Sequence, residues 1–345
     1  MKYTTLPNTN IEVSKICLGT MTFGEQNSEA EGHQQMDYAL EKGVNFFDTA
    51  EMYSVPAREE TYGSTERIIG TWFKKTGNRD KVVLASKIAG PNPNFTYMRE
   101  KADFSPASVK YALENSLKRL QTDYIDLYQL HWPERKTNCF GQRGFKVQDE
   151  IWEDNFREVL ETFDGLIKEG KIKHIGVSNE NPWGMMRFLE ESKYQNLPRI
   201  KTIQNPYSLL NRLFEVGSAE VSMHEKVGLL AYSPLAFGVL SGKFLTGEPL
   251  PNARINLFPQ YKRYNSEEST QATRLYQEIA HKHGLTLTEL ALGFVLQQPF
   301  LTSAIIGATT IEQLKENIAT IDIVLSNEIL AEIDAVQTII PDPAP

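Results

Sequence analysis

Cysteine is scarce in this chain, which has only Cys17 and Cys139 among its 345 residues. The two stand far apart, whereas disulfide frameworks and zinc sites show several cysteines at short spacing. The sequence therefore predicts neither a disulfide scaffold nor a cysteine-based metal site. A protein with so few cysteines fits a reducing compartment, and we expect a cytoplasmic location.

Long apolar runs and an excess of basic residues are also missing. No stretch approaches the roughly 18 consecutive apolar residues that a membrane helix needs, and the opening residues MKYTTLPNTN lack the apolar core of a secretion signal. Lysine and arginine number 36 against 44 aspartates and glutamates, for a formal net charge of -8. Nucleic acids and anionic membranes attract basic surfaces, so neither is expected as the main partner.

No linker divides the chain, whose length suffices for one large core, so we predict a single domain over 1–345. Short apolar segments alternate with amphipathic helical patterns, which is typical of a parallel (β/α)8 TIM barrel. A doubly wound open sheet is the alternative. That fold would favour a G-x-G-x-x-G turn after the first strand, whereas the segment 18–24 has two glycines at a different spacing. The eight strand candidates are 16–18, 44–47, 82–85, 125–130, 172–177, 202–204, 228–232 and 303–306.

Start and stop signals support the helices between these strands. Ser105 can cap a helix that Pro106 opens, and Gly170 can end a second helix over 156–167 because glycine tolerates a positive φ. Ahead of the first barrel strand, the segments 2–6 and 11–14 flank a turn at 7–10. We expect them to form an N-terminal β-hairpin that closes the barrel floor.

Polar residues follow nearly every predicted strand. In such barrels the chemistry lies at the carboxyl ends of the strands, and a polar group left buried without a partner there costs several kcal/mol, roughly 2–7. Taken singly, Asp48 is a helix cap, Lys87 a solvated rim charge, His131 a satisfied core histidine, and Ser178-Asn179 a cap for a helix over 183–192. Their equivalent positions on successive strands favour a shared site instead. The residues concerned are Asp48, Lys87, His131, Ser178, Asn179, Gln204 and Tyr232, with Tyr53 just after Asp48.

These residues stand in motifs that resemble the aldo-keto reductase superfamily over nearly the whole chain. Within it the chain is most similar to the bacterial Tas-type reductases and, more distantly, to the potassium-channel β-subunit branch. The motifs are Asp48-Thr49-Ala50-Glu51-Met52-Tyr53, Ala85-Ser86-Lys87, Leu127-Tyr128-Gln129-Leu130-His131, Gly176-Val177-Ser178-Asn179 and Gly307-Ala308-Thr309-Thr310, the last followed by Gln313, Glu316 and Asn317.

The resemblance implies reduction of a small-molecule aldehyde or ketone by a nicotinamide cofactor, with four catalytic residues. Tyr53 would give its proton to the carbonyl oxygen, so we expect it to be a stronger acid than a free phenol, whose pKa is about 10. Lys87 would lower that pKa by stabilising the phenolate, and Asp48 would keep Lys87 charged. His131 would orient the carbonyl through a hydrogen bond.

The resemblance also implies the cofactor contacts. Ser178, Asn179 and Gln204 would bind the carboxamide while Tyr232 stacks on the nicotinamide ring. The further contacts are Gly19, Thr20, Met21 and Asp48 near the ring, Ser233, Leu235, Lys243 and Arg254 along the phosphates, and Gly307, Thr309, Gln313, Glu316 and Asn317 around the adenosine.

Two positions depart from the pattern of many family members, which have an arginine at Gln313 and a lysine at Gly307. Both cations would recognise a 2'-phosphate. We still favour NADPH over NADH, because the channel-subunit branch shares the glutamine, and Lys243 with Arg254 would supply the charge. The alternative for these two is a solvated loop pair.

Two loops and one histidine pair remain. The segment 54–61 looks like an insertion beside the barrel mouth, and 133–155, with Cys139, Phe140, Phe145 and Trp152, forms either a wall of the substrate pocket or a surface excursion. His281 and His283 suggest a metal pair, but without a third ligand in view they fit the polar end of a helix better, so no metal is predicted.

Three functions follow from this sequence: an NADPH-dependent carbonyl reductase, which we favour, a nicotinamide-binding regulatory module with slow turnover, and a barrel enzyme without nicotinamide. The last leaves Ser178, Asn179, Gln204 and Tyr232 unexplained together. The identity of the carbonyl compound and the oligomeric state stay open, since no heptad pattern or long apolar surface helix indicates an interface.

Overall fold

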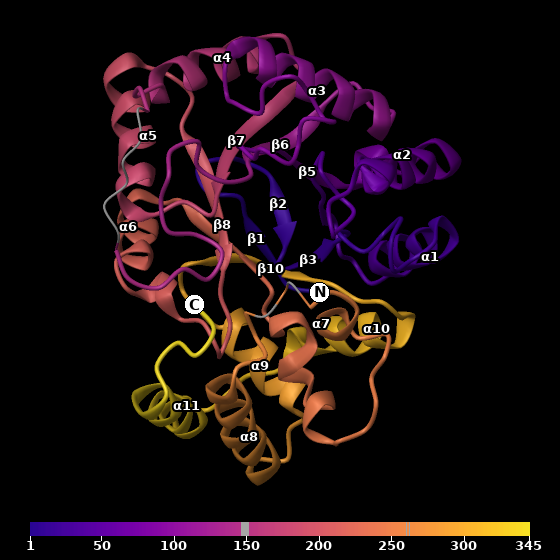
Figure 1. Cartoon of the computed structure of the whole chain (residues 1–345), viewed down its shortest axis with the longest axis vertical. Helices are drawn as coiled ribbons and strands as arrows, with labels where there is room; N and C mark the ends of the chain where they lie inside the picture. Colours follow the sequence, from indigo (N-terminus) through magenta and orange to yellow (C-terminus); the bar gives the residue numbers. More distant parts are fainter. Residues whose placement is uncertain (146–151, 260, 262) are drawn as a thin grey trace.

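The structure, a computed structural model, describes residues 1–145, 152–259, 261 and 263–345. Eight parallel strands form a closed barrel in the order β10-β3-β4-β5-β6-β7-β8-β9 (Figure 1). This closure confirms the predicted (β/α)8 barrel over the doubly wound sheet. The strands are β3 (Ile16–Gly19), β4 (Phe46–Asp48), β5 (Val83–Ile88), β6 (Ile125–Leu130), β7 (Ile172–Ser178), β8 (Ile200–Pro206), β9 (Gly228–Tyr232) and β10 (Leu301–Ile306).

Each predicted strand overlaps an observed one, but β5 runs further than predicted. Polar Ser86 and Lys87 belong to the strand, and Lys87 pairs in register with Gln129 of β6. The prediction ended at the first polar side chain. The backbone ladder continues because both residues find polar partners within the fold, as described below.

Helices surround the barrel, as Figure 1 shows with α1 to α6 forming an arc around one side and α8 to α11 lying at the other. The predicted cap is confirmed, since Ser105 accepts a hydrogen bond from the Ser108 amide, and Gly170 takes a φ of 75° just beyond α4. The helices are α1 (Glu29–Glu41), α2 (Ser64–Thr76), α3 (Pro106–Leu120), α4 (Phe156–Lys168), α5 (Pro182–Gln195), α6 (Ser218–Glu225), α7 (Arg254–Leu257), α8 (Glu267–Lys282), α9 (Leu287–Leu296), α10 (Ile311–Ala319) and α11 (Asn327–Ile339).

The predicted hairpin is present as β1 (Tyr3–Thr5) and β2 (Glu12–Ser14), which pair antiparallel. The Ser14 amide donates to the side-chain oxygen of Asn45, just before β4, and the buried Val13 packs with Cys17 and Phe46 inside the barrel. The hairpin therefore closes the amino-terminal end of the barrel, opposite the strand ends where the predicted site lies.

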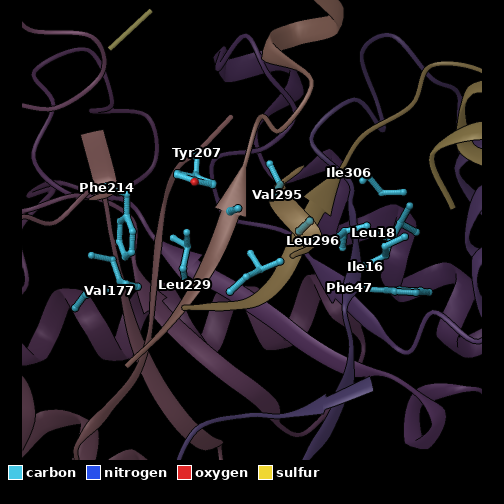
Figure 2. Close-up of a cluster of buried hydrophobic side chains, with 14 of the residues drawn as sticks. Ile16, Leu18, Phe47, Val177, Tyr207, Phe214, Leu229, Val295, Leu296 and Ile306 are labelled. Atoms are coloured by element: carbon cyan, nitrogen blue, oxygen red, sulfur yellow. The ribbon is translucent and has the colours of Figure 1, made fainter. Parts of the chain in front are cut away.

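The strands divide their apolar residues between two clusters. Ile16 and Leu18 pack outward in the large cluster beneath the helices, part of which is drawn in Figure 2. Cys17, between them, packs inward with Phe46 and Leu230. This alternation follows from the two-residue repeat of a strand. Among the described residues, no helix is both long and apolar enough to cross a membrane.

Candidate active site

A cavity of about 1000 Å³ opens at the carboxyl ends of the barrel strands, at the upper end of the range for ligand pockets. It is lined where β4, β7, β8, β9 and β10 end, as the parallel barrel requires. All but one of the predicted site residues line it. They are Gly19, Thr20, Met21, Asp48, Tyr53, His131, Ser178, Asn179, Gln204, Tyr232, Ser233, Leu235, Lys243, Arg254, Gly307, Thr309, Gln313, Glu316 and Asn317.

The exception, Lys87, lies beneath the cavity floor with its side chain fully buried. Its ammonium nitrogen is 2.7 Å from Asp48 Oδ2 and donates a second 2.7 Å hydrogen bond to the Thr49 carbonyl. Burial by itself would lower the pKa of Lys87, but Asp48 and Tyr53 outweigh it and raise that pKa above its ordinary value. Lys87 is therefore a permanent cation, which excludes the solvated rim charge.

The other carboxylate oxygen of Asp48 also accepts hydrogen bonds. Gln204 of β8 donates to Asp48 Oδ1 at 2.8 Å, and Gln129 of β6 approaches the same oxygen at 3.4 Å. Gln129 is a site residue that the sequence reasoning missed. Strand alternation could have found it, because Leu127, two residues earlier, packs inside the barrel.

Tyr53 lies over this ion pair, with the Lys87 nitrogen 4.9 Å from the centre of its ring. Burial raises the pKa of Tyr53 above its ordinary value, and the Lys87 ammonium only partly opposes that rise. The expectation of a more acidic phenol is therefore wrong for this structure, because desolvation of the phenolate outweighs one nearby cation. Tyr53 is fully protonated at neutral pH.

His131 stands across from Tyr53, and their ring centres are 5.6 Å apart in an edge-to-face arrangement. Burial, with a smaller effect from Lys87, holds the pKa of His131 well below its usual 6.5, so its imidazole is neutral. Its Nδ1 atom has no hydrogen-bond partner among the described residues.

Asn179 links the ends of three strands. Its amide nitrogen donates to the His131 carbonyl at 2.8 Å, and its oxygen accepts a 2.7 Å hydrogen bond from the Tyr232 hydroxyl. Ser178 donates to the Gln204 carbonyl at 2.7 Å. The alternative of a helix cap is wrong for this pair, because Asn181 caps α5 through the Gly184 amide.

Lys243 and Arg254 lie on another side of the cavity. Arg254 donates to Gln26 Oε1 at 3.2 Å and lies 5.1 Å from the centre of the Phe237 ring. Burial lowers its pKa to about 10, and burial together with Arg254 lowers the pKa of Lys243. Neither forms an ion pair with a carboxylate of the described residues. A cation pair without a counter-charge in a cavity fits an anionic ligand such as a pyrophosphate.

The residues expected at the adenosine lie around the start of α10. Gln313 accepts a 3.0 Å hydrogen bond from the Thr309 amide, and Asn317 donates to the Gly307 carbonyl at 3.3 Å. A side chain at Gly307 would meet no atom within 4 Å. The backbone thus does not require a glycine at this position for lack of space.

Comparison with known proteins agrees with this geometry. The Aldo/keto reductase family model matches residues 15–338. The chain belongs to this family. It is 50% identical over 346 aligned residues to Protein tas of Escherichia coli, covering all of both chains. It is also 37% identical to the uncharacterized oxidoreductase YrpG of Bacillus subtilis, over 96% of this chain and 94% of that one. Aldo-keto reductase YhdN of Bacillus subtilis is 31% identical over 91% and 87%. As a member of the family, the protein is an oxidoreductase.

Two loops contribute to the cavity wall. Val55 of the segment 54–61 lines the cavity, as do Trp132, Phe140 and Gly141 of the loop after β6. Phe140 and Gly141 therefore place part of the segment 133–155 at the cavity wall, whereas Phe145 is exposed and Trp152 packs on Phe156. Residues 146–151 of that segment lie outside the described residues.

The two histidines lie at the end of a helix, as predicted. His281 is in the last turn of α8 and His283 is its C-cap. The structure adds what the sequence did not reveal, because Glu328 and Glu332 of α11 place carboxylates near the His283 ring. Lys282 already binds Glu332 at 2.6 Å. The cluster therefore has its own cation, and we assign no metal to it.

Proposed function

We propose that the protein reduces aldehydes or ketones to alcohols with NADPH. The observation that carries this proposal is the fully buried Lys87 ammonium, which is paired with Asp48 directly beneath the Tyr53 ring. A permanent cation below a protonated phenol favours transfer of the phenol proton, because the cation stabilises the phenolate that is left behind.

The pKa values of Tyr53 and His131 suit these two side chains to different roles in the reduction of a carbonyl. Tyr53 keeps its proton at neutral pH and can donate it to a carbonyl oxygen as negative charge develops there. His131 is neutral, so it can direct a hydrogen bond to the same oxygen without competing as an acid. NADPH, when bound, would supply the hydride. Asp48 and Gln204 keep the Lys87 ammonium fixed throughout.

The cavity supports a nicotinamide dinucleotide as the second ligand. Asn179 and Ser178 carry amide and hydroxyl groups beside Tyr232, where a carboxamide and a flat ring can bind. Lys243 and Arg254 lie where phosphates would reach, and their lack of carboxylate partners among the described residues favours the phosphate-rich NADPH over NADH. We also propose a small-molecule carbonyl substrate and a cytoplasmic location, the latter on the low cysteine content.

Replacing Tyr53 with phenylalanine tests the proposal. The NADPH affinity of the Y53F protein, measured by tryptophan fluorescence, should lie within a few-fold of that of the unchanged protein. Its turnover of an aromatic aldehyde should be at least about a hundredfold slower. Tyr128→Phe is the matched control, because Tyr128 is buried outside the cavity and its hydroxyl has no partner among the described residues. It should leave turnover unchanged.

Two results would contradict the proposal. Near-normal turnover by Y53F would remove Tyr53 from the proton transfer. Tight NADPH binding by the unchanged protein without turnover would favour a nicotinamide-binding regulatory module instead.

A further inference from the structure

The arginines of this protein are unevenly paired. Nine of the fourteen arginines form an ion pair with a carboxylate within 4.0 Å. Five have no such partner among the described residues, and three of these, Arg143, Arg254 and Arg263, line the cavity described above. A partly buried guanidinium without a counter-charge is costly, so its presence at a cavity wall indicates an anionic ligand.

Arg263 is the cavity cation that the proposed phosphate contacts leave unassigned. Arg254 lies 5.1 Å from the Phe237 ring, that ring lies 5.0 Å from the Tyr264 ring, and Arg263 lies 5.9 Å from the Tyr264 ring. Arg263 also interacts with the hydroxyl groups of Tyr232 and Tyr264, neither of which carries a negative charge at neutral pH. Arg143 is exposed and donates at 2.7 Å to the Asp342 carbonyl, so it is already engaged.

Arg263 instead borders the part of the cavity next to His131. A Cβ built on Gly141 would lie 3.2 Å from Arg263 Nε, so the guanidinium touches the loop after β6. From His131 the wall continues through Trp132, with 5.0 Å between ring centres, and on to Phe140 at 6.0 Å. The surface that leads from the reacting groups to Arg263 is thus aromatic.

From this arrangement we propose that the substrate is an aromatic carbonyl compound with a carboxylate remote from the carbonyl, and that Arg263 binds this carboxylate. The inference rests on the proposed reductase function and adds the substrate class. The carbonyl would face Tyr53 and His131, the flat body would lie along Trp132 and Phe140, and the carboxylate would supply the counter-charge that Arg263 lacks. A guanidinium fork suits a carboxylate because it can donate two parallel hydrogen bonds.

Matched substrate pairs test this directly. The three positional isomers of carboxybenzaldehyde and their neutral formylbenzamide counterparts would be reduced with NADPH by the full-length protein. For the best isomer, kcat/KM should favour the carboxylate over the amide by tenfold or more, the lower end of what a charge-assisted hydrogen bond supplies. Higher salt should reduce the preference.

Variants at Arg263 then locate the effect. In Arg263→Gln the preference should fall to about one, mainly through the KM of the carboxylate compound, and Arg263→Lys should retain part of it. Arg274→Gln is the matched control, because Arg274 is exposed on α8, outside the cavity, and also lacks a carboxylate partner among the described residues. It should keep the full preference.

The alternative outcomes separate the two proposals. Equal kcat/KM for carboxylate and amide in the unchanged protein would overturn the substrate class and leave the reductase standing. A variant R263Q that weakens NADPH binding and slows both compounds equally would assign Arg263 to the cofactor. No turnover of any of the six compounds would overturn the reductase and this inference with it.

Discussion

A buried ion pair close to Tyr53 in the sequence offers a sharp test of how the site is held. Glu51, two residues before Tyr53, is fully buried, and its Oε1 accepts from Arg99 Nη1 at 2.6 Å and from the Ala89 amide at 2.7 Å. Arg99 donates in return to the Ala89 carbonyl at 2.6 Å. The pair thus ties the loop that bears Tyr53 to the segment that follows β5.

Replacing Glu51 with glutamine keeps the shape but removes the counter-charge of Arg99, whose side chain is only 4% exposed. A buried charge left without its partner costs about 3–5 kcal/mol. The entropy of unfolding is about 2.1 cal/mol/K per residue, so over 345 residues the Tm should fall by about 4–7 °C.

Replacing the arginine of the pair instead of the glutamate should give a loss of stability that depends on pH. In Arg99→Met the remaining carboxyl can take up a proton, whereas arginine in E51Q cannot lose one. Burial already raises the pKa of Glu51 above 4.5 despite Arg99. Without Arg99 the folded protein binds this proton more tightly than the unfolded chain does. The stability of R99M should therefore recover as pH falls from 7 toward 5, whereas E51Q, which keeps an unpaired arginine at every pH, should show no such recovery.

Thermal unfolding of the unchanged protein, both single variants and the double variant, at pH 7 and pH 5.5, would measure these effects. The double variant should lose clearly less stability than the sum of the two single losses, because it leaves no uncompensated charge. Additive losses, or an R99M penalty that does not change with pH, would refute the reasoning.

Four further predictions concern other parts of the structure. Lys243→Ala and Arg254→Ala should weaken NADPH binding much more than NADH binding, and equal losses in fluorescence titrations would show that they carry no phosphate charge. Because the folded-state pKa of His131 lies well below 6.5, the stability that the protein has above pH 6.5 is lost as pH falls toward that lower pKa. The free energy of unfolding of His131→Gln, measured in urea, should therefore fall less between pH 6.5 and 5 than that of the unchanged protein. Gly70→Ala should destabilise by about 1–3 kcal/mol, since its Cβ would lie 2.2 Å from a backbone oxygen of α3. Gly165→Ala, with nothing within 4 Å, should stabilise by about 0.5–1 kcal/mol.

The barrel and the reacting residues were accessible from sequence because both depend on local signals. Strand alternation places Leu18 outward and Cys17 inward, and the end of each strand marks the cavity wall. Asp48, Tyr53 and His131 therefore meet at the cavity as predicted, with Lys87 directly beneath it. Asp48 and Lys87 are placed by their strands alone, whereas Tyr53 also depends on the loop after β4.

Features that depend on long-range packing were not accessible in the same way. The pKa shift of Tyr53 combines the effects of burial and of nearby charges, and its direction depends on how completely the loops cover the side chain. Arg263 meets Gly141 across more than a hundred residues of sequence, through loops whose course no periodicity predicts. Glu328 and Glu332 join His283 only because α11 packs beside α8.

The buried charges near the site share one sector of the barrel, and this explains how Lys87 is held so far from water. Lys87 points inward from β5 to Asp48, while the adjacent Ser86 points outward and donates to Glu66 of α2 at 2.6 Å. Glu66 is in turn paired with Arg119 of α3 at 2.7 Å. The strand that carries Lys87 is therefore bound on both faces by polar contacts that cannot shift without breaking a buried pair. Such rigidity keeps the ammonium where a phenolate would form, which is what electrostatic stabilisation of a proton transfer requires.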